Sequence, residues 1–530
     1  MPGKVLNLLN EPLIRIRRTG GAAIERISLP ELLVLMADDA VASYPALRAH
    51  QRFAWHAFLV QLAAIALDRA DRTDPPASAE AWADLLRALT PDHPDDAPWC
   101  LVAPHDRPAF LQAAVPGGDV GAFKPVPSPD ALDMLVTSRN HDLKRAAMVT
   151  PELDDWLMAL ITVQTMDGGL SGSYRGIARM NSDYGSRPCV SVRPEGGPGA
   201  WFVRDVRTLL RCRADIAQTH SYPAIGGHAL LWVTIWDGKG PVYRRDQLDP
   251  LFIEICRRIR FEVGMDDRIG CLKSTNKSLI DGGFRGGITG DPWTPVNIGD
   301  EKIFTINKQR MLGYRQCIDL MDGALFRPSP LQVVSGDDSE DSLSVFAAAM
   351  VRGSGKTAGY HERRIPVSKA VKRLLSAGAA DRIAAAGHAR AELVGKLSYR
   401  VLRPALHCLL RDGKEAERLT PKQSANLDRR ADSWLERLDH EADATFFSDL
   451  WREFETEDGA ERERIRNAWL QGLIERAAAI LGEACRAVPL ASIHRYRARA
   501  RAKGLFRFLE RKQFPQLYPE TTDAAADNAA

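Results

Sequence analysis

The sequence of 530 residues lacks several patterns that mark common functional classes. Its eight cysteines form no C-x-x-C pair, which argues against a zinc ribbon and against a disulfide scaffold. No run of about 18 apolar residues is present, and the first residues do not form a signal peptide, so a soluble cytoplasmic protein is expected. The formal net charge of +3 gives no strong overall field, so any nucleic-acid binding depends on local patches.

Motifs of hydrolases and metalloenzymes are missing as well. The sequence contains no G-x-S-x-G and no H-E-x-x-H, and its adjacent acids at 93–96 and 265–268 are better explained as turn residues. His50 and His56 lie six residues apart on a strongly apolar helix and therefore point in well-separated directions. We interpret them as core or surface histidines rather than metal ligands, and no catalytic constellation stands out in the sequence.

One stretch comes close to a nucleotide-binding motif. Gly355-Lys356-Thr357 resembles the end of a P-loop, but the first glycine of the motif would fall at Met350. A P-loop also needs a helix after its last residue, whereas here Gly359 and Pro366 follow. An NTPase that uses Lys356 is therefore the less favoured alternative, and the cluster of cations around this lysine needs another explanation.

The N-terminal part of the sequence predicts an irregular mixture of helices and strands. Alternating residues around Gly20-Gly21 predict a hairpin, and Ser28 is expected to cap a helix over 29–37. Further helices are predicted at 51–70, 79–89 and 151–166. Short strands are predicted at 228–236 and 301–306.

The pattern changes near Pro366. Long helical stretches are predicted from there onward, at 367–379, 381–412, 423–447, 460–486 and 490–511, with a kink or break at Pro404. The predicted fold class is therefore α+β: a large, irregular, mixed α/β domain over residues 1–365, followed by a helical bundle over 366–514. Residues 515–530 have too little apolar content to fold and are expected to form a disordered tail.

Five segments carry signals of nucleic-acid binding, and one of them is the cation-rich stretch 351–364 around Lys356. For the other four, solvated surface loops or a solvated helix would be an explanation too. Residues 137–148 supply phosphate and base-edge donors, namely Arg139, Asn140, His141, Lys144 and Arg145. Two stretches, 167–188 and 276–295, are rich in glycine, which lets a backbone approach a nucleic-acid groove closely. Both also contain cations, which in the second stretch are Lys277 and Arg285. The last helix, over 494–512, has eight Lys or Arg residues against one Glu.

Taken together, several stretches resemble one protein family. They are "LNLLNEPLIRIR", "AHQRFAWHAFLVQLAA", "RPAFLQ", "TSRNHDLKRAAM", "QTMDGGLSGSYRGIARMN", "GDPWTP" and "KTAGYHERRIP". The combination resembles the large subunit of the type I-E CRISPR surveillance complex Cascade, the CasA family. The likeness touches most of residues 6–366 and continues, by its helical pattern, into the bundle.

The resemblance implies a non-catalytic subunit with a mixed α/β N-terminal domain and a C-terminal four-helix bundle. Such a subunit belongs to a crRNA-guided antiviral complex, recognises the protospacer-adjacent motif (PAM) of double-stranded DNA from the minor groove, helps to open the duplex and recruits the helicase-nuclease. Its partners would be crRNA, target DNA, the helicase-nuclease, and the backbone, small and 5′-handle-binding subunits. Some members bind zinc through two C-x-x-C pairs, which this chain lacks, so we predict no zinc and no cofactor.

The resemblance also implies roles for individual residues. The glycine loop of the family corresponds to residues 168–173, with groove contacts from Gly168, Gly169, Ser171, Gly172 and Ser173. The wedge corresponds to Gly353-Ser354-Gly355, where some members carry Asn-Gln-Ala-type residues, so Arg352 or Lys356 is expected to contribute.

The lysine finger of the family corresponds to Lys277 or Arg285, and Lys277 is preferred. Residues 139–145 resemble the loop of the family near the crRNA end and a neighbouring subunit. A structural assembly subunit without direct DNA contact is the other alternative that the sequence leaves open.

Overall fold

The structure is a computed structural model in which the chain forms two compact units. It describes residues 6–133, 148, 150–168, 174–179, 187–264, 268–281, 284–306, 312–336, 338, 342–353, 356–414 and 420–518, with the backbone alone at 351–353 and 356–358. The first unit comprises Met1–Leu312 and Gly323–Lys372, and the second comprises Gly313–Asp322 and Arg373–Ala530. The second unit thus includes a short segment that the sequence assigned to the first domain.

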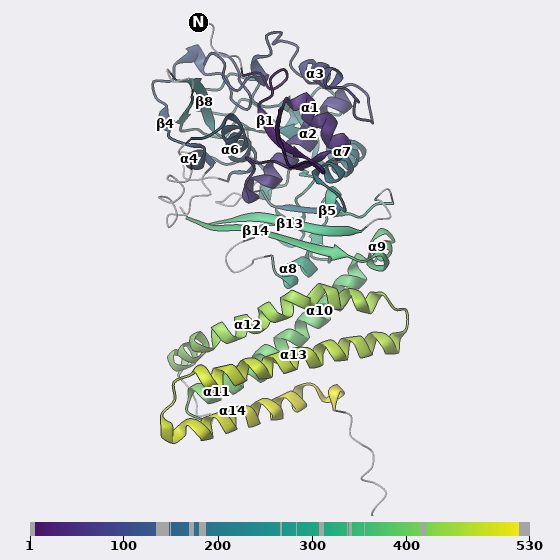
Figure 1. Ribbon diagram of the computed structural model, residues 1–530, viewed down its shortest axis with the longest axis vertical. Helices are drawn as coiled ribbons and strands as arrows, with labels where there is room; N and C mark the ends of the chain where they lie inside the picture. The colour runs from purple at the N-terminus through teal and green to yellow at the C-terminus, as the bar shows by residue number, and fades with distance from the viewer. Residues whose placement is uncertain are drawn as a thin grey trace, which may run out of the picture. The chain divides into compact units, whose positions relative to one another are not determined.

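The first unit mixes helices with short strands, in keeping with the predicted α+β class (Figure 1). Its helices are α1 (Leu29–Ala37), α2 (Arg52–Arg69), α3 (Ala79–Ala88), α4 (Pro129–Asp133), α6 (Leu153–Met166) and α7 (Pro198–His220). Its strands are β1 (Ile14–Arg18), β2 (Ile24–Ile27), β3 (Val41–Ser43), β4 (Lys124–Val126), β5 (Cys189–Pro194), β6 (His228–Leu230), β7 (Leu248–Ile253), β8 (Arg258–Val263), β9 (Ile269–Ser274), β10 (Val296–Asn297), β11 (Lys302–Ile303), β12 (Phe326–Arg327), β13 (Leu343–Gly353) and β14 (Lys356–Val367). Helix α9 (Lys369–Ser376) crosses the boundary between the units.

The strands of the first unit form several small sheets rather than one large sheet. Four of these sheets have three strands, in the orders β2-β1-β3, β4-β9-β8, β11-β10-β12 and β14-β13-β5, and β6 pairs with β7 in parallel. The expected hairpin at the start of the chain is β1 and β2, and Ile14 and Ile16 of β1 are fully buried. The side chain of Ser28 caps α1 and forms a capping box with Glu31, as the sequence predicted.

Helix α2 lies at the centre of the core of the first unit. It has no charged residue between Arg52 and Asp68, and a helix that is apolar on all sides is stable only when it is surrounded by other elements. It packs against α6 and α7. The ring of His56 stacks on Trp201 with centroids 3.6 Å apart, and its Nε2 lies 2.9 Å from Asp205. The prediction of a core histidine is therefore confirmed for His56.

The longest strands form the sheet β14-β13-β5. Strands β13 and β14 form an antiparallel hairpin in which Leu343 pairs with Val367 and Gly353 pairs with Lys356. Strand β5 runs along the other edge of β13, and Phe346 of β13 packs on Trp201 of α7 with ring centroids 5.0 Å apart. The hairpin is thereby anchored to the core of its unit at its base, while its tip reaches residues 353–356.

The second unit is a bundle of long helices. They are α10 (Ala380–Lys396) continued by the π-helical turn Leu397–Leu402 and α11 (Arg403–Leu410), then α12 (Pro421–Phe454), α13 (Gly459–Ala487) and α14 (Ser492–Gln513), with the short α8 (Tyr314–Asp319) packed against α10. The expected break at Pro404 is instead a π-helical turn directly before it. A wider turn accommodates a proline without interrupting the helix, because the ring would otherwise clash with a carbonyl of the preceding turn.

The structure differs from the sequence-based expectations at two other places. Residues 198–220 form the long helix α7, where the sequence analysis predicted no helix. The predicted strand at 228–236 is reduced to β6, because a turn follows in which the backbone N–H of Val233 donates to the carbonyl oxygen of Leu230. Trp232 and Trp236 are core side chains that donate to the carbonyl oxygens of Pro98 and Gly240 through their indole nitrogens. Beyond α14, Phe514 is buried and residues 515–517 form a 3-10 turn, whereas 519–530 lie outside the described residues.

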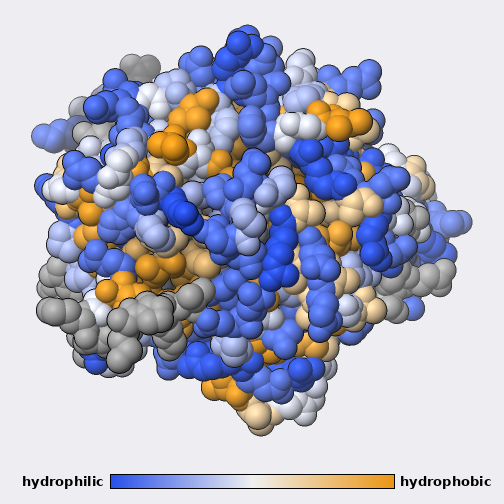
Figure 2. Space-filling model, turned by 90° about the horizontal axis from the view of Figure 1, so that it is seen from above, coloured by the Kyte–Doolittle hydropathy of each residue, from blue (hydrophilic) through white to orange (hydrophobic). Residues whose placement is uncertain are grey.

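The surface seen in Figure 2 is largely hydrophilic, with apolar residues gathered only in small separate patches. Scattered apolar patches of this kind are ordinary on proteins in water. Among the helices that the structure describes, none is long and apolar enough to cross a membrane.

Candidate nucleic-acid interface

The hairpin of β13 and β14 shows whether Lys356 belongs to a P-loop. In the hairpin, Gly353 pairs with Lys356 and Arg352 pairs with Thr357, so the lysine begins a strand. A P-loop requires a helix at this point, whose N-terminal N–H groups would face the phosphates. The segment therefore does not have P-loop geometry, and Lys356 lies instead at the tip of an antiparallel hairpin. Ser354 and Gly355 lie outside the described residues.

The two ends of the glycine segment, residues 168–173, are held by one buried side chain. The guanidinium of Arg257 donates a 2.7 Å hydrogen bond to the carbonyl oxygen of Gly168, and its other terminal nitrogen donates to the carbonyl oxygens of Arg175 and Cys256. The same guanidinium lies 3.9 Å from the carboxylate of Asp167. Arg257 thus fixes the chain on both sides of the segment, independently of the residues between.

Lys277 is placed beside the end of the glycine segment by backbone pairing. Tyr174 and Asn276 form an isolated parallel β-bridge. The amide of Asn276 donates to the carbonyl of Cys256 at 2.8 Å, and the backbone N–H of Lys277 donates to Gly238 at 2.8 Å. These bonds fix the backbone of Lys277 while its side chain remains exposed. It makes no ion pair with the residues that the structure describes, so its charge is directed to solvent.

A second lysine, Lys273, lies in this region. The Nζ of Lys273 lies 5.5 Å from the ring centroid of Tyr174, close enough for a cation–π interaction. Burial lowers the pKa of Lys273, and the positive charge of Arg257 lowers it further. Lys277 therefore presents an exposed positive charge beside the glycine segment, whereas Lys273 is half-buried and Arg257 is buried near the carboxylate of Asp167.

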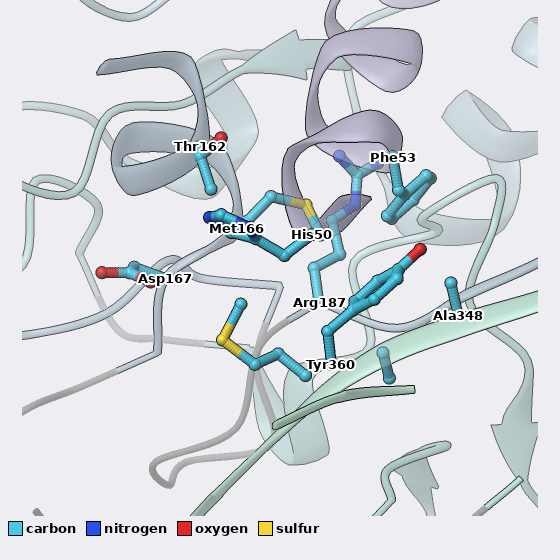
Figure 3. Close-up of a pocket in the computed structure, with 10 residues that line it drawn as sticks. His50, Phe53, Thr162, Met166, Asp167, Arg187, Ala348 and Tyr360 are labelled. Carbon is cyan, nitrogen blue, oxygen red and sulfur yellow. The ribbon is translucent and has the colours of Figure 1, made fainter. Parts of the chain in front are cut away.

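A small cavity joins the start of the glycine segment to the hairpin (Figure 3). Asp167 shares it with Met350 of β13 and Tyr360 of β14. The other side chains around it come from the start of α2, from α6 and from neighbouring strands, namely His50, Phe53, Thr162, Met166, Arg187, Ala348 and Ala349. The volume open to the centre of a water molecule is about 10 Å³, so the cavity has room for one water molecule.

The size and polarity of this cavity indicate a structural rather than a ligand-binding role. A pocket for a small molecule is typically about 300–1,000 Å³. His50 is part of the cavity wall, and its Nε2 lies 2.7 Å from the carboxylate of Asp133, which confirms the prediction of a core histidine. The cavity therefore marks a packed junction, at which the part of the hairpin nearer its tip lies against Asp167, directly before the glycine segment.

Arg285, the other candidate for the lysine finger, has a different environment. Its side chain is 87% exposed and forms an ion pair with Glu301 at 2.7 Å. Its segment is held by a close approach of Gly286 to the backbone, at which a Cβ would lie 2.2 Å from the carbonyl oxygen of Glu301. The structure therefore pairs Arg285 with an acid, whereas Lys277 faces solvent beside the glycine segment.

The other predicted site residues cannot be compared with the structure. Gly169, Ser171, Gly172 and Ser173 lie outside the described residues, and so does the predicted crRNA-end segment with Arg139, Asn140, His141, Lys144 and Arg145. Among the residues that are described, no group of three His, Cys, Asp or Glu side chains could hold a metal ion.

Sequence reasoning missed the residues that support the site. Arg257, Lys273 and Asn276 were not singled out, because each lies in or beside a strand and carries no motif. One signal was available in "CRRIRFEV", where three arginines stand among apolar residues. Buried arginines in an apolar strand must find acceptors, and backbone carbonyls of neighbouring loops are the acceptors that Arg257 and Arg260 use.

The fold of the chain is that of the CasA (Cse1) proteins. No protein-family model and no curated protein matches the sequence, but solved structures match over nearly the whole chain. CasA from Thermus thermophilus is 14% identical, with a TM-score of 0.63, covering 96% of this chain and 99% of that chain. Cse1 from Acidimicrobium ferrooxidans is 15% identical, with a TM-score of 0.62, covering 98% of this chain and 100% of that chain.

A third match is a chain of a structure described as a CRISPR RNA-guided surveillance complex. It is 14% identical, with a TM-score of 0.60, covering 96% of this chain and 99% of that chain. The family resemblance noted in the sequence is therefore confirmed at the level of the fold. At these identities the matches establish a shared architecture, and the roles of individual residues have to be argued from their own surroundings.

Proposed function

We propose that this chain is the large subunit of a crRNA-guided antiviral complex, and that it recognises the PAM of double-stranded DNA. The observation that carries the proposal is the pairing of Tyr174 with Asn276, which brings Lys277 to the end of the glycine segment within a CasA fold. A glycine-rich segment with few side chains next to an exposed lysine suits the narrow minor groove, which presents mainly acceptors.

Guide RNA and protein would recognise different parts of the target. Base pairing with the guide identifies the target sequence, so protein has to identify only a short neighbouring motif. Lys277 would donate to base-edge acceptors, while backbone N–H groups of the glycine segment approach the groove without intervening side chains. The hairpin tip with Gly353, Lys356 and the two residues between would contact the duplex where it opens.

The proposed role extends to RNA and to protein partners. We propose that residues 139–145 contact the crRNA end or a neighbouring subunit, and that the chain recruits a helicase-nuclease instead of cutting DNA itself. The other subunits of the complex, crRNA and target DNA would be its partners. The absence of P-loop geometry at Lys356 supports a role without ATP hydrolysis.

The proposal is tested by assembling the complex. The chain is co-expressed with a guide RNA and the other Cascade-type subunits from the same source, purified through a tag on this chain, and incubated with duplexes that carry a randomised motif beside one target. We expect co-purification of RNA and enrichment of a short motif among the bound duplexes. Co-purification without motif enrichment would favour a structural assembly subunit that does not contact DNA, and failure to co-purify would reject both roles.

A further inference from the structure

The last helix of the second unit presents a cationic face that the proposed PAM site does not use. Helix α14 carries eight Lys or Arg residues and a single acid, Glu510. It packs against α11, α13 and the π-helical turn through Ala498, Ala502 and Phe506, which are buried. The opposite side of the helix faces solvent (Figure 1, yellow).

The exposed residues follow helical spacing and therefore share one face. Tyr496, Lys503, Arg507 and Arg511 follow one another at intervals of four or seven residues, and Arg497 and Phe508 lie beside them on the same side. Over these residues the helix rises by about 20 Å. We call the set Tyr496, Arg497, Lys503, Arg507, Phe508 and Arg511 the α14 face.

The cations of the α14 face are not neutralised within the protein. Arg497, Lys503, Arg507 and Arg511 make no ion pair with any residue that the structure describes. The one acid of the helix, Glu510, instead accepts a hydrogen bond from the hydroxyl of Tyr518. Four unneutralised charges on one face repel one another, so a face of this kind is stabilised by an anionic partner.

Two aromatic side chains on the same face indicate which anionic partner fits. Tyr496 is 81% exposed and Phe508 is 62% exposed, which is unusual for rings of this size on a protein surface. Arg507, Phe508 and Arg511 also line an open hollow of about 650 Å³. Cations that follow a backbone, interleaved with rings on which bases stack, are the features of surfaces that bind single-stranded nucleic acid.

We propose that the α14 face binds single-stranded nucleic acid, with its four cations on phosphates and with Tyr496 and Phe508 stacked on unpaired bases. A duplex would satisfy the cations but not the rings, since paired bases are already stacked on one another. The proposal goes beyond PAM recognition and does not depend on it. In a protein that opens a duplex, such a surface would hold a strand that has been released.

The experiment measures the binding of the full chain to a fluorescein-labelled oligo(dT) of about 20 nucleotides by anisotropy, at several salt concentrations. We expect Lys503→Glu with Arg507→Glu to weaken binding at least tenfold and to reduce the salt slope by about 1.4, since each phosphate contact on a single strand contributes about 0.7. The matched control is Arg429→Glu with Arg430→Glu, an equal charge change on exposed residues of α12 in the same unit.

The aromatic residues separate base stacking from general attraction. Tyr496→Ala with Phe508→Ala should weaken oligo(dT) binding about fivefold or more, leave the salt slope unchanged and leave the weaker binding of a hairpin duplex of the same length unaffected. Lys503→Glu with Arg507→Glu should weaken oligo(dT) binding by the same factor in a chain that also carries Lys277→Ala, which distinguishes this surface from the proposed PAM site. Circular dichroism checks the fold of each variant.

Three results would overturn the proposal. Equal loss of affinity in the α12 control would show that only net charge matters. Unchanged binding after removal of both rings would show that bases are not stacked there. Full retention of oligo(dT) binding in the Lys503 and Arg507 variant would show that the α14 face serves another partner, such as an acidic protein surface.

Discussion

The guanidinium of Arg257 donates a hydrogen bond of 2.7 Å to the carbonyl oxygen of Gly168, the first residue of the glycine segment. Because Arg257 also donates to Arg175 beyond the end of that segment, one rigid side chain fixes the distance that the segment has to span. Arginine is suited to this role because its planar fork has several donors in a fixed arrangement. The segment can therefore be rich in glycine and still start and end at defined points.

Replacement of Arg257 tests this relationship. Arg257→Ala would leave buried carbonyl oxygens without donors, and we expect the free energy of unfolding to fall by about 1–3 kcal/mol. Arg257→Lys keeps the charge but cannot reach both ends of the segment, so it should remain folded and become more sensitive to proteases at residues 168–175. Limited proteolysis with mass spectrometry measures this. Equal protease resistance of the lysine variant and the unmodified chain would show that the arginine does not hold the segment.

The two candidate finger residues provide a matched pair of variants. We expect Lys277→Ala to weaken the binding of PAM-bearing duplex by the assembled complex by about 1–3 kcal/mol, because in the proposed function it would remove a charged donor at a base edge. Arg285→Ala removes the same charge from an exposed residue that is already paired with Glu301, and it should change binding little. Gel shifts on duplexes with and without the motif measure both. A larger effect of the arginine variant would reverse the assignment.

Much of the fold could be predicted from local patterns. The capping box of Ser28 and Glu31, the apolar helix α2 and the long helices of the bundle depend on residues close together in sequence, and all of them are present. Helix α7 was missed although Trp201, Phe202, Asp205 and Leu209 repeat with helical spacing. The glycines before it and Pro198-Gly199 at its start masked the pattern, since Gly199 is needed for close approach to α1 rather than for a loop.

The arrangement of the site could not be predicted in the same way. Tyr174 and Asn276 are far apart in the sequence, and nothing in either segment indicates that they pair. The contact of Arg257 with Gly168 and the cavity shared by Asp167 and Met350 depend equally on tertiary packing. The sequence shows which type of residue stands at each place. The pairing of strands and the burial of Arg257 could be seen only in the folded structure.

Lys356 provides a test between the alternatives that its motif suggested. We expect Lys356→Ala to weaken target binding by the assembled complex by about 1–3 kcal/mol, because a cation at the hairpin tip would lie near phosphates. Neither form should hydrolyse ATP, since Lys356 begins strand β14. The matched control is Lys369→Ala, an exposed lysine at the start of α9. ATP turnover that disappears with Lys356→Ala would restore the NTPase alternative.

The buried His56 should make the first unit sensitive to acid. Burial lowers the pKa of His56 below its usual value of 6.5, despite the opposing effect of Asp205. Between the two values the unfolded chain binds a proton that the folded chain does not, so the free energy of unfolding decreases as the pH falls below about 6.5. Urea denaturation monitored by tryptophan fluorescence between about pH 7.5 and pH 5 measures this change, because Trp201 stacks on the imidazole.

The variant His56→Gln separates this histidine from the other titrating groups. Glutamine can still donate to Asp205, but it has no proton to bind in this range and loses the stacking on Trp201. We therefore expect lower stability at about pH 7.5 and a shallower decrease toward pH 5, because the contribution that depends on His56 has gone. A decrease as steep as that of the unmodified chain would assign the acid sensitivity to the carboxylates. If the unmodified chain instead gained stability relative to the variant as the pH fell from about 7.5 to about 6.5, His56 would be protonated in the folded chain.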